Sequence, residues 1–391
     1  MNFRGANASY YPLAITIAIL LLLPAIAFSQ SYVQSNLVSN SKSIPASTTD
    51  PNLVNPWGMV QGPSTPFWVS DQVTNLSTVY TGNGTKLPLN VGIPTIGTGP
   101  VNGPTGIVFN SGTGFSLSTT SSVPSLFLFD DLNGTIDGWN PKSSGGTASA
   151  VTGITTPGAT YTGLAINATG SLVYAANFAS SGGVNVFNSS WKSMGSLNLP
   201  SSISLPSNYE PYNVSDVSGT LFIAYDLRGS NGLPVLGAGD GAVIEYDPTT
   251  GMYTELVKPG RGDGLDAPWG FAMAPSSGFG KFSGDLLVGD FGSGWISAYN
   301  PSNGDFLGYL DNTSGKPIAD GGLWTLDFGN GADGTNPDTL YITAGITQPF
   351  QTQGLLAAIN QTPEPSTFAL FGTAVLAMAF IYLRRKHSNA A

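Results

Sequence analysis

Three short sequence markers recur six times, in a fixed order, along most of this 391-residue chain. The first marker opens an apolar strand, and its copies centre on residues 57, 105, 162, 212, 269 and 324. The intervals between these centres are 48, 57, 50, 57 and 55 residues. A supersecondary unit that repeats at this spacing predicts the blades of a β-propeller, in which every unit packs on its neighbours.

The second marker is a short apolar strand, and five of its six copies end on a carboxylate or an amide. The third marker is a strand that follows a Gly-rich turn. Each copy therefore holds three or four strands, which predicts one six-bladed, all-β propeller over residues 30–361. The sixth copy has only three strands, so we expect the lone strand at 32–38 to complete it and to close the ring, because closure removes two exposed sheet edges.

Composition agrees with this fold and excludes several functions. Charged residues make up 9% and hydrophobic residues 41% of the chain, which is too apolar for a disordered protein. There is no Cys, and the one His is His387 near the end, so the body has no disulfide, no His-based triad and no His or thiolate metal centre. Residues 30–362 hold 9 Lys and Arg against 22 Asp and Glu, a net charge of −13 that argues against a nucleic-acid partner.

The first 29 residues have the pattern of a signal peptide. Arg4 precedes an apolar run over 13–23, and small residues then offer a cleavage position after Ala27 or after Ser29. The chain is therefore expected to be exported.

The last segment, 362–391, combines three features. Pro363, Glu364 and Pro365 precede an apolar run over 368–383, and the basic residues Arg384, Arg385 and Lys386 follow it. As a helix the run spans about 24 Å, which is short of a hydrocarbon core of roughly 30 Å. The basic cluster predicts that the C-terminus stays in the cytoplasm, so this transmembrane helix would anchor the exported body only transiently.

This tail resembles the PEP-CTERM sorting signal, with motif, helix and basic stop in the same order. The resemblance implies an exosortase-type membrane protease as partner, and a host that makes exopolysaccharide. The body resembles an uncharacterised family of bacterial NHL-like propellers, on DPNLVNPWG at 50–58, LLVGDFGSGWISAYN at 286–300 and GLWTLDFGNG at 322–331. That resemblance implies a fold and no activity.

The start of each inner strand and the end of each second strand are expected to open on one face of the propeller. This places nine residues around one opening: Trp57, Tyr212, Trp269, Trp324, Asp71, Asp130, Asn177, Asp226 and Asp290. Such a funnel could hold a sugar, or Ca²⁺ through its oxygen atoms. The alternative is structural: the Asp side chains accept bonds from turn N–H groups, and the rings pack between blades. The structural interpretation is favoured, because residues that recur in every repeat usually serve the repeat.

The sequence thus favours a non-catalytic surface module that binds polysaccharide or a surface protein, without a cofactor or a catalytic residue. The alternative is a Ca²⁺-dependent propeller hydrolase of the lactonase or sugar-acid type. Glu is scarce in the body, where Glu210, Glu245 and Glu255 are the only three, and none ends a second strand. This scarcity favours the first hypothesis.

Overall fold

The computed structural model describes residues 30–95, 102–117, 123–260, 264–346 and 352–362, together with 375, 377–379 and 381. Residues Ser31–Thr362 form one compact unit. The predicted signal peptide over 1–29 and the motif Pro363-Glu364-Pro365 lie outside the described residues.

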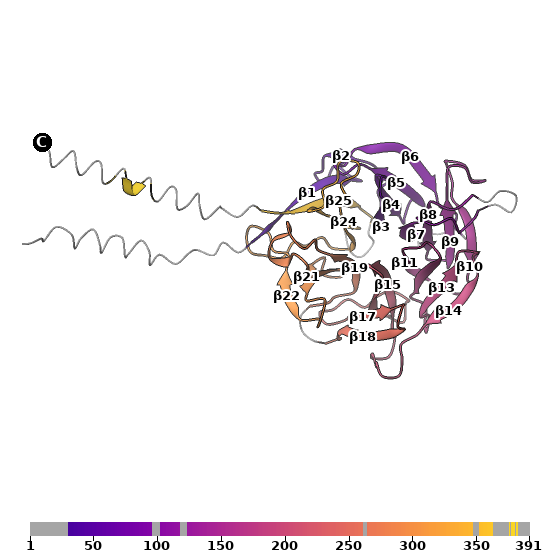
Figure 1. Cartoon of the computed structure of the whole chain (residues 1–391). Helices are drawn as coiled ribbons and strands as arrows, with labels where there is room; N and C mark the ends of the chain where they lie inside the picture. Colours follow the sequence, from indigo (N-terminus) through magenta and orange to yellow (C-terminus); the bar gives the residue numbers. More distant parts are fainter. Residues whose placement is uncertain are drawn as a thin grey trace, which may run out of the picture. The chain divides into compact units, whose positions relative to one another are not determined.

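Six antiparallel sheets are arranged around a common axis, which confirms the six-bladed propeller (Figure 1). The strands of blade 1 are β3 (Pro56–Gln61), β4 (Phe67–Asp71), β5 (Leu76–Tyr80) and β6 (Lys86–Gly92). Those of blade 2 are β7 (Pro104–Phe109), β8 (Phe127–Asp131), β9 (Thr135–Trp139) and β10 (Val151–Thr155). Those of blade 3 are β11 (Tyr161–Ile166), β12 (Leu172–Asn177), β13 (Val184–Asn188) and β14 (Ser193–Leu197).

The second half of the ring repeats the same order. The strands of blade 4 are β15 (Tyr209–Val217), β16 (Thr220–Leu227), β17 (Ala242–Asp247) and β18 (Met252–Val257). Those of blade 5 are β19 (Pro268–Met273), β20 (Leu286–Asp290), β21 (Ile296–Tyr299) and β22 (Phe306–Tyr309), with a 3₁₀ helix at Gly280–Phe282. Those of blade 6 are β23 (Leu323–Phe328), β24 (Leu340–Ala344), β25 (Leu355–Gln361), β1 (Tyr32–Ser39) and the short β2 (Thr48–Thr49).

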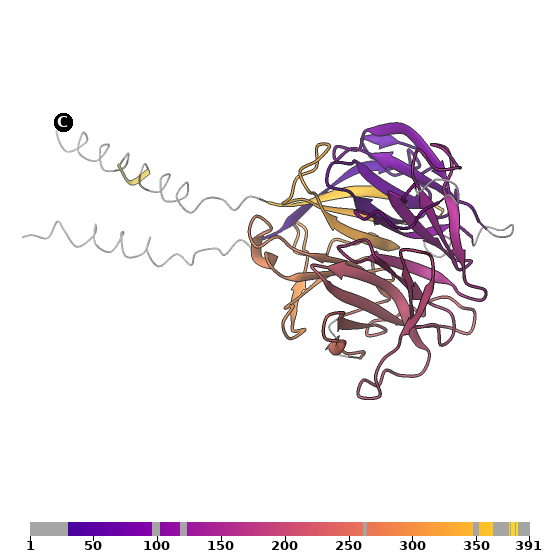
Figure 2. The ribbon, with the colours of Figure 1, turned by 45° about the vertical axis from the view of Figure 1, so that its right-hand side comes forward.

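The N-terminal strand closes the ring as predicted. β1 pairs antiparallel with β25, from Tyr32 opposite Gln361 to Ser39 opposite Leu355. In the tilted view of Figure 2 the indigo and yellow ends of the propeller meet at this pair. The sixth blade therefore takes its outer strand from the opposite end of the chain, and no blade is left with three strands.

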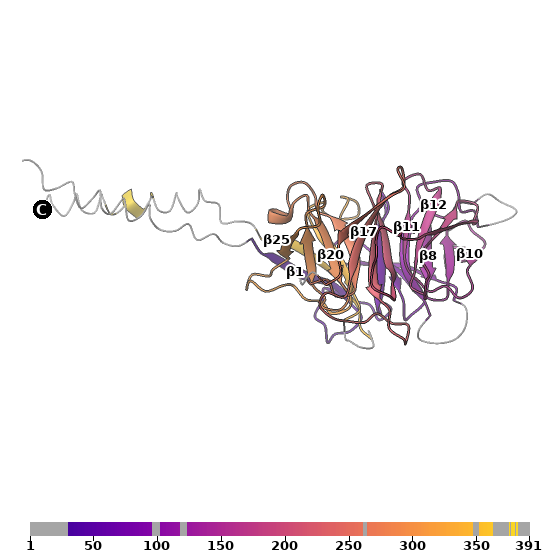
Figure 3. The same cartoon turned by 90° about the horizontal axis from the view of Figure 1, so that it is seen from below.

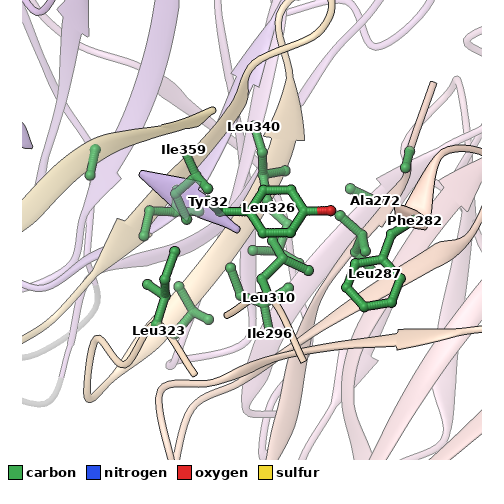
Figure 4. Close-up of a cluster of buried hydrophobic side chains, with 14 of the residues drawn as sticks. Tyr32, Ala272, Phe282, Leu287, Ile296, Leu310, Leu323, Leu326, Leu340 and Ile359 are labelled. Carbon is green, nitrogen blue, oxygen red and sulfur yellow. The ribbon is translucent and has the colours of Figure 1, made fainter. Parts of the chain in front are cut away.

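Tyr32 anchors the closing strand in a core between blades 5 and 6 (Figure 4). Its side chain is fully buried, and its hydroxyl donates a hydrogen bond to the carbonyl oxygen of Phe279, 3.0 Å away. The Tyr32 ring stacks near that of Phe282, with ring centroids 6.2 Å apart. The closure is therefore held by side-chain packing as well as by the strand ladder.

Middle strands are buried on both faces because each blade is covered by two neighbours. All five residues of β20 are buried, as the apolar run Leu286-Leu287-Val288 predicts. Outer strands are less buried, and four of the five residues of β14 are exposed. Figure 3 shows the strands of successive blades side by side, so every blade presents one inner edge to the axis.

Glycine in the first marker sets how closely the inner strands approach. A Cβ atom on Gly58 would lie 2.6 Å from the carbonyl oxygen of Thr105 in the next blade. Blades 4 and 6 have Asn213 and Thr325 at this position, and both side chains reach the next inner strand. The Asn213 amide donates to the carbonyl oxygen of Trp269 at 2.6 Å, and the Thr325 hydroxyl donates to that of Trp57 at 2.8 Å. The inner strands are thus tied into a narrow ring.

Candidate functional site

The four aromatic residues predicted at the start of the inner strands lie in one buried cluster. Its aromatic members are Trp57, Phe178, Tyr212, Trp269, Phe291 and Trp324. The rings of Trp57 and Trp324 stack with centroids 3.5 Å apart, and Trp269 meets Trp57 edge-on at 6.1 Å. None of the four predicted rings is more than 6% exposed. Their faces are therefore already occupied by one another.

This aromatic cluster closes the axis. Trp57 belongs to blade 1 and Tyr212 to blade 4 on the opposite side of the ring, yet their ring centroids are 6.4 Å apart. The Trp269 indole N–H crosses from blade 5 to donate to the carbonyl oxygen of Thr162 in blade 3, at 2.8 Å. Contacts between opposite blades fill the centre of the propeller at this end.

The five polar residues that end the second strands are buried as well, at most 7% exposed. Most of them bind local donors, as the structural interpretation expects. Asp130 accepts from the Gly106 N–H at 2.5 Å, and Asn177 accepts from the N–H groups of Thr160 and Ala179 at 2.9 and 3.1 Å. Asp71, Asp130 and Asp290 each have one carboxylate oxygen that accepts a hydrogen bond. The donors are the Thr78 hydroxyl for Asp71, the Thr105 hydroxyl and the Gly106 N–H for Asp130, and the Asp266 N–H for Asp290.

Asp226 differs from the others, because neither of its buried carboxylate oxygens has a donor of normal geometry within the described part of the chain. Burial raises the pKa of Asp226 to about 9 and that of Asp130 to about 7. Burial also raises the pKa values of Asp71 and Asp290 well above the ordinary value. Burial therefore favours the protonated form of these carboxyl groups, which lowers the negative charge of the set.

The structure thus brings the predicted residues together and buries them, so they do not line an open funnel. The inner strands approach one another closely at their marker glycines, and the rings contact one another across the axis. Whether this end takes part in ligand binding stays a prediction.

An axial channel of about 550 Å³ lies beyond the aromatic cluster and is lined by all six inner strands. Trp269 is the one member of the nine predicted residues among its described lining. In β3 the first four residues are buried, whereas Val60 and Gln61 at its end are half-buried. The last residue of each other inner strand is half-buried too. Water therefore reaches the channel from the face where the inner strands end.

The mouth of this channel mixes apolar and polar side chains. Phe109 and Phe328 are half-buried at the ends of their strands, with Ser215 and Ser218 in the same lining. Asp216 and Asp327 are the two ionisable residues of the described lining, which holds no Lys or Arg. Burial raises the pKa of Asp327 to about 7. The mouth can therefore present rings, hydroxyl groups and carboxylates to one ligand.

Sequence reasoning missed the channel and its polar residues. The available signals were Asn213 and Thr325, which replace the marker glycine, and Asp327, which interrupts the apolar inner strand LWTLDF. Within the residues that the structure describes, no group of three or more carboxylates lies close enough to hold a metal ion.

Residues 361–386 match the family model described as the PEP-CTERM protein-sorting motif. The motif implies export to the cell envelope or surface and processing by an exosortase-type membrane enzyme. Among the described residues no helix is both long and apolar enough to cross a membrane, and most of the predicted helix 368–383 lies outside them. Transient anchoring and the cytoplasmic position of Arg384, Arg385 and Lys386 stay predictions.

The propeller is similar to viral proteins. Two uncharacterized proteins of Acanthamoeba polyphaga mimivirus are each 29% identical to this chain. The first match covers 73% of this chain and 71% of the relative, and the second covers 74% and 76%. The bacterial origin and the NHL-like character expected from the sequence stay predictions.

Solved structures that align with the chain are also propeller proteins. A streptogramin B lyase is 10% identical with a TM-score of 0.44, and the alignment covers 86% of this chain and 100% of that one. A gluconolactonase from Xanthomonas campestris is 13% identical with a TM-score of 0.35, covering 78% of this chain and 100% of that one.

Proposed function

We propose that this exported propeller is a non-catalytic binding module that acts at the cell surface, and that its ligand is a hydroxyl-rich polymer such as a matrix polysaccharide. The observation that carries the proposal is the axial channel, closed at one end by aromatic rings and reached by water at the other. A concave, partly enclosed site that presents a few placed polar groups is a usual form of ligand pocket.

The chemistry of the mouth suits sugars. The half-buried rings of Phe109 and Phe328 keep part of their surface exposed beside their contacts with Phe127 and Phe279, and that surface can cover an apolar C–H face of a sugar. Hydroxyl groups of the sugar can donate to Asp216 and Asp327 and exchange hydrogen bonds with Ser215. In this proposal the nine marker residues build the rigid floor of the site, and Trp269 alone of them reaches the channel.

The proposal is tested by blocking the mouth. Val217 lies in the channel lining at the end of β15, and Val217→Trp would fill the entrance. Val73→Trp is the matched control, because Val73 is 39% exposed in the β4–β5 turn at the closed end. Sedimentation with insoluble polysaccharides and a glycan array would measure binding of the mature protein and of both variants.

We expect Val217→Trp to lose at least about tenfold in polysaccharide affinity, equivalent to roughly 1.4 kcal/mol, and Val73→Trp to bind like the parent protein. The proposal fails if no glycan is retained, or if the two variants bind equally well while both melt like the parent.

A further inference from the structure

The described lining of the channel mouth is acidic. It contains Asp216 and Asp327 and no Lys or Arg. The two carboxylates differ in how they are satisfied. One oxygen of Asp216 accepts from the Gly219 N–H at 2.8 Å, within the turn that follows β15. Asp327 makes no ion pair and no hydrogen bond to another side chain within the described part of the chain, and the backbone N–H of Phe328 is the one donor that lowers its pKa.

The position of Asp327 follows from the strand register. Asp327 lies opposite Tyr341 in the ladder between β23 and β24, so the two side chains share one face of blade 6. The Tyr341 ring contacts Phe67 of blade 1, with centroids 4.7 Å apart, so this face is the one toward blade 1. The next residue, Phe328, points the other way and meets Phe279 of blade 5 at 4.9 Å. Asp327 therefore lies between the inner strands of blades 6 and 1.

A carboxylate in this place is costly unless something pairs with it. Protein surrounds Asp327, although it remains half-buried rather than sealed, and the loss of water raises its pKa to about 7. A carboxylate without a counter-charge, in a channel that a ligand can enter, is complementary to a cation.

We propose that the mouth of the axial channel binds an amino sugar, with the ammonium group of the sugar donating to the carboxylate of Asp327. The inference rests on the proposed sugar-binding function and adds the charge of the ligand to it. An ammonium group has three donors and no acceptor, so it satisfies a carboxylate by charge-assisted hydrogen bonds. A neutral hydroxyl or an acetamido group at the same sugar carbon cannot supply that charge.

Three oligosaccharides with the same β-1,4-linked backbone separate these cases. They are hexamers of glucose, of N-acetylglucosamine and of glucosamine, and they differ only in the substituent at the second carbon. Calorimetric titration of the mature protein at pH 7, where the raised pKa of Asp327 still leaves a share of its carboxyl groups ionised, should show the glucosamine hexamer binding about 10- to 100-fold more tightly than the other two, the range expected for hydrogen bonds to charged groups.

Asp327→Asn tests the residue, and Asp305→Asn in the exposed β21–β22 turn is a control with the same change of charge. Asp327→Asn should bind the glucosamine hexamer as weakly as the other two hexamers and should melt no lower than the parent, since an amide carries no buried charge. Equal binding of all three hexamers by the parent, or an unchanged glucosamine affinity in Asp327→Asn, would overturn the inference while leaving the proposed function intact. Failure to bind any hexamer or polysaccharide would overturn both.

Discussion

At the scale of single residues, the marker glycine is a packing requirement. The backbone of Gly58 lies against that of the next blade, so a methyl group at this position would force two inner strands apart. We expect Gly58→Ala to lower the free energy of unfolding by about 1–3 kcal/mol, the usual cost of overpacking. Urea unfolding would measure this change.

Gly92→Ala is the control for that variant. Gly92 lies in β6, and the nearest atom to its added Cβ would be 3.5 Å away, an ordinary contact. It should therefore change the free energy of unfolding by less than about 0.5 kcal/mol. Equal effects of the two substitutions would show that the close approach of the inner strands is not what the glycine serves.

Buried carboxyl groups make stability depend on pH. Burial raises the pKa of Asp137 from 3.8 to about 7, so the folded protein keeps this proton up to about pH 7, whereas the unfolded chain loses it near pH 4. The stability that this group contributes is complete below about pH 4 and is lost as the pH rises through 7.

We therefore expect the free energy of unfolding to fall as the pH rises from 5 to 7, by up to about 1.4 kcal/mol per pH unit for each such group. Asp130 has the same shift and adds to the slope. Asp137→Asn should reduce the slope of the free energy of unfolding against pH by the contribution of one carboxyl group. Chemical unfolding at pH 5, 6, 7 and 8 would measure it, and identical slopes in parent and variant would contradict the expectation.

Residue roles were harder to predict than residue positions. Trp57 and Tyr212, which the first marker singles out, lie in one buried cluster, but the repeat pattern does not show how wide the axis is. The width depends on how closely strands from different blades approach one another. Gly58 indicates such a close approach, but only because it has no Cβ atom that would clash with the next strand. Asp327 lies inside an apolar strand, and nothing local in the sequence shows that it borders a channel.

At the scale of elements, the closing strand should contribute strongly to stability. Tyr32 is fully buried against Phe279 and Phe282, so Tyr32→Ala should cost about 3–5 kcal/mol. Val33, its neighbour on the other face of β1, is 45% exposed, and Val33→Ala should cost less than about 0.5 kcal/mol. Thermal unfolding of both variants would measure the difference, and similar melting temperatures would show that β1 does not hold the ring closed.

The closure of the ring could be predicted from the sequence because it follows from the number of strands in each copy of the repeat. Five copies of the repeat offer a fourth strand and the sixth does not, so an unpaired segment near the N-terminus has one favourable place. The parallel addition of β2 to β1, at Val38 and Ser39, could not be predicted in the same way. Its two residues show no alternating pattern and pair only because the chain turns back there.

At the scale of the whole molecule, the last residue of the folded propeller directly precedes the sorting motif. Thr362 is the last described residue of the propeller, and its N–H donates to the carbonyl oxygen of Ser31 at 2.9 Å. The hydroxyl groups of the two residues are also 3.0 Å apart. The described propeller thus ends at Thr362, directly before Pro363. Removal of the chain from Pro363 onward therefore leaves β25 and its pairing with β1 complete.

Glu364 is the charged residue of the sorting motif, and Glu364→Ala should block processing of the tail. In a host that has the exosortase-type enzyme, the variant should accumulate as a longer form in the membrane fraction, while the parent appears as the shorter form; immunoblots of both fractions would show this. Ser366→Ala, two residues further along, is the control and should be processed like the parent.

The longer and shorter forms should melt at the same temperature, because the propeller is complete at Thr362. Equal processing of Glu364→Ala and the parent would contradict the role of the motif, and a lower melting temperature of the shorter form would show that the fold extends into the tail.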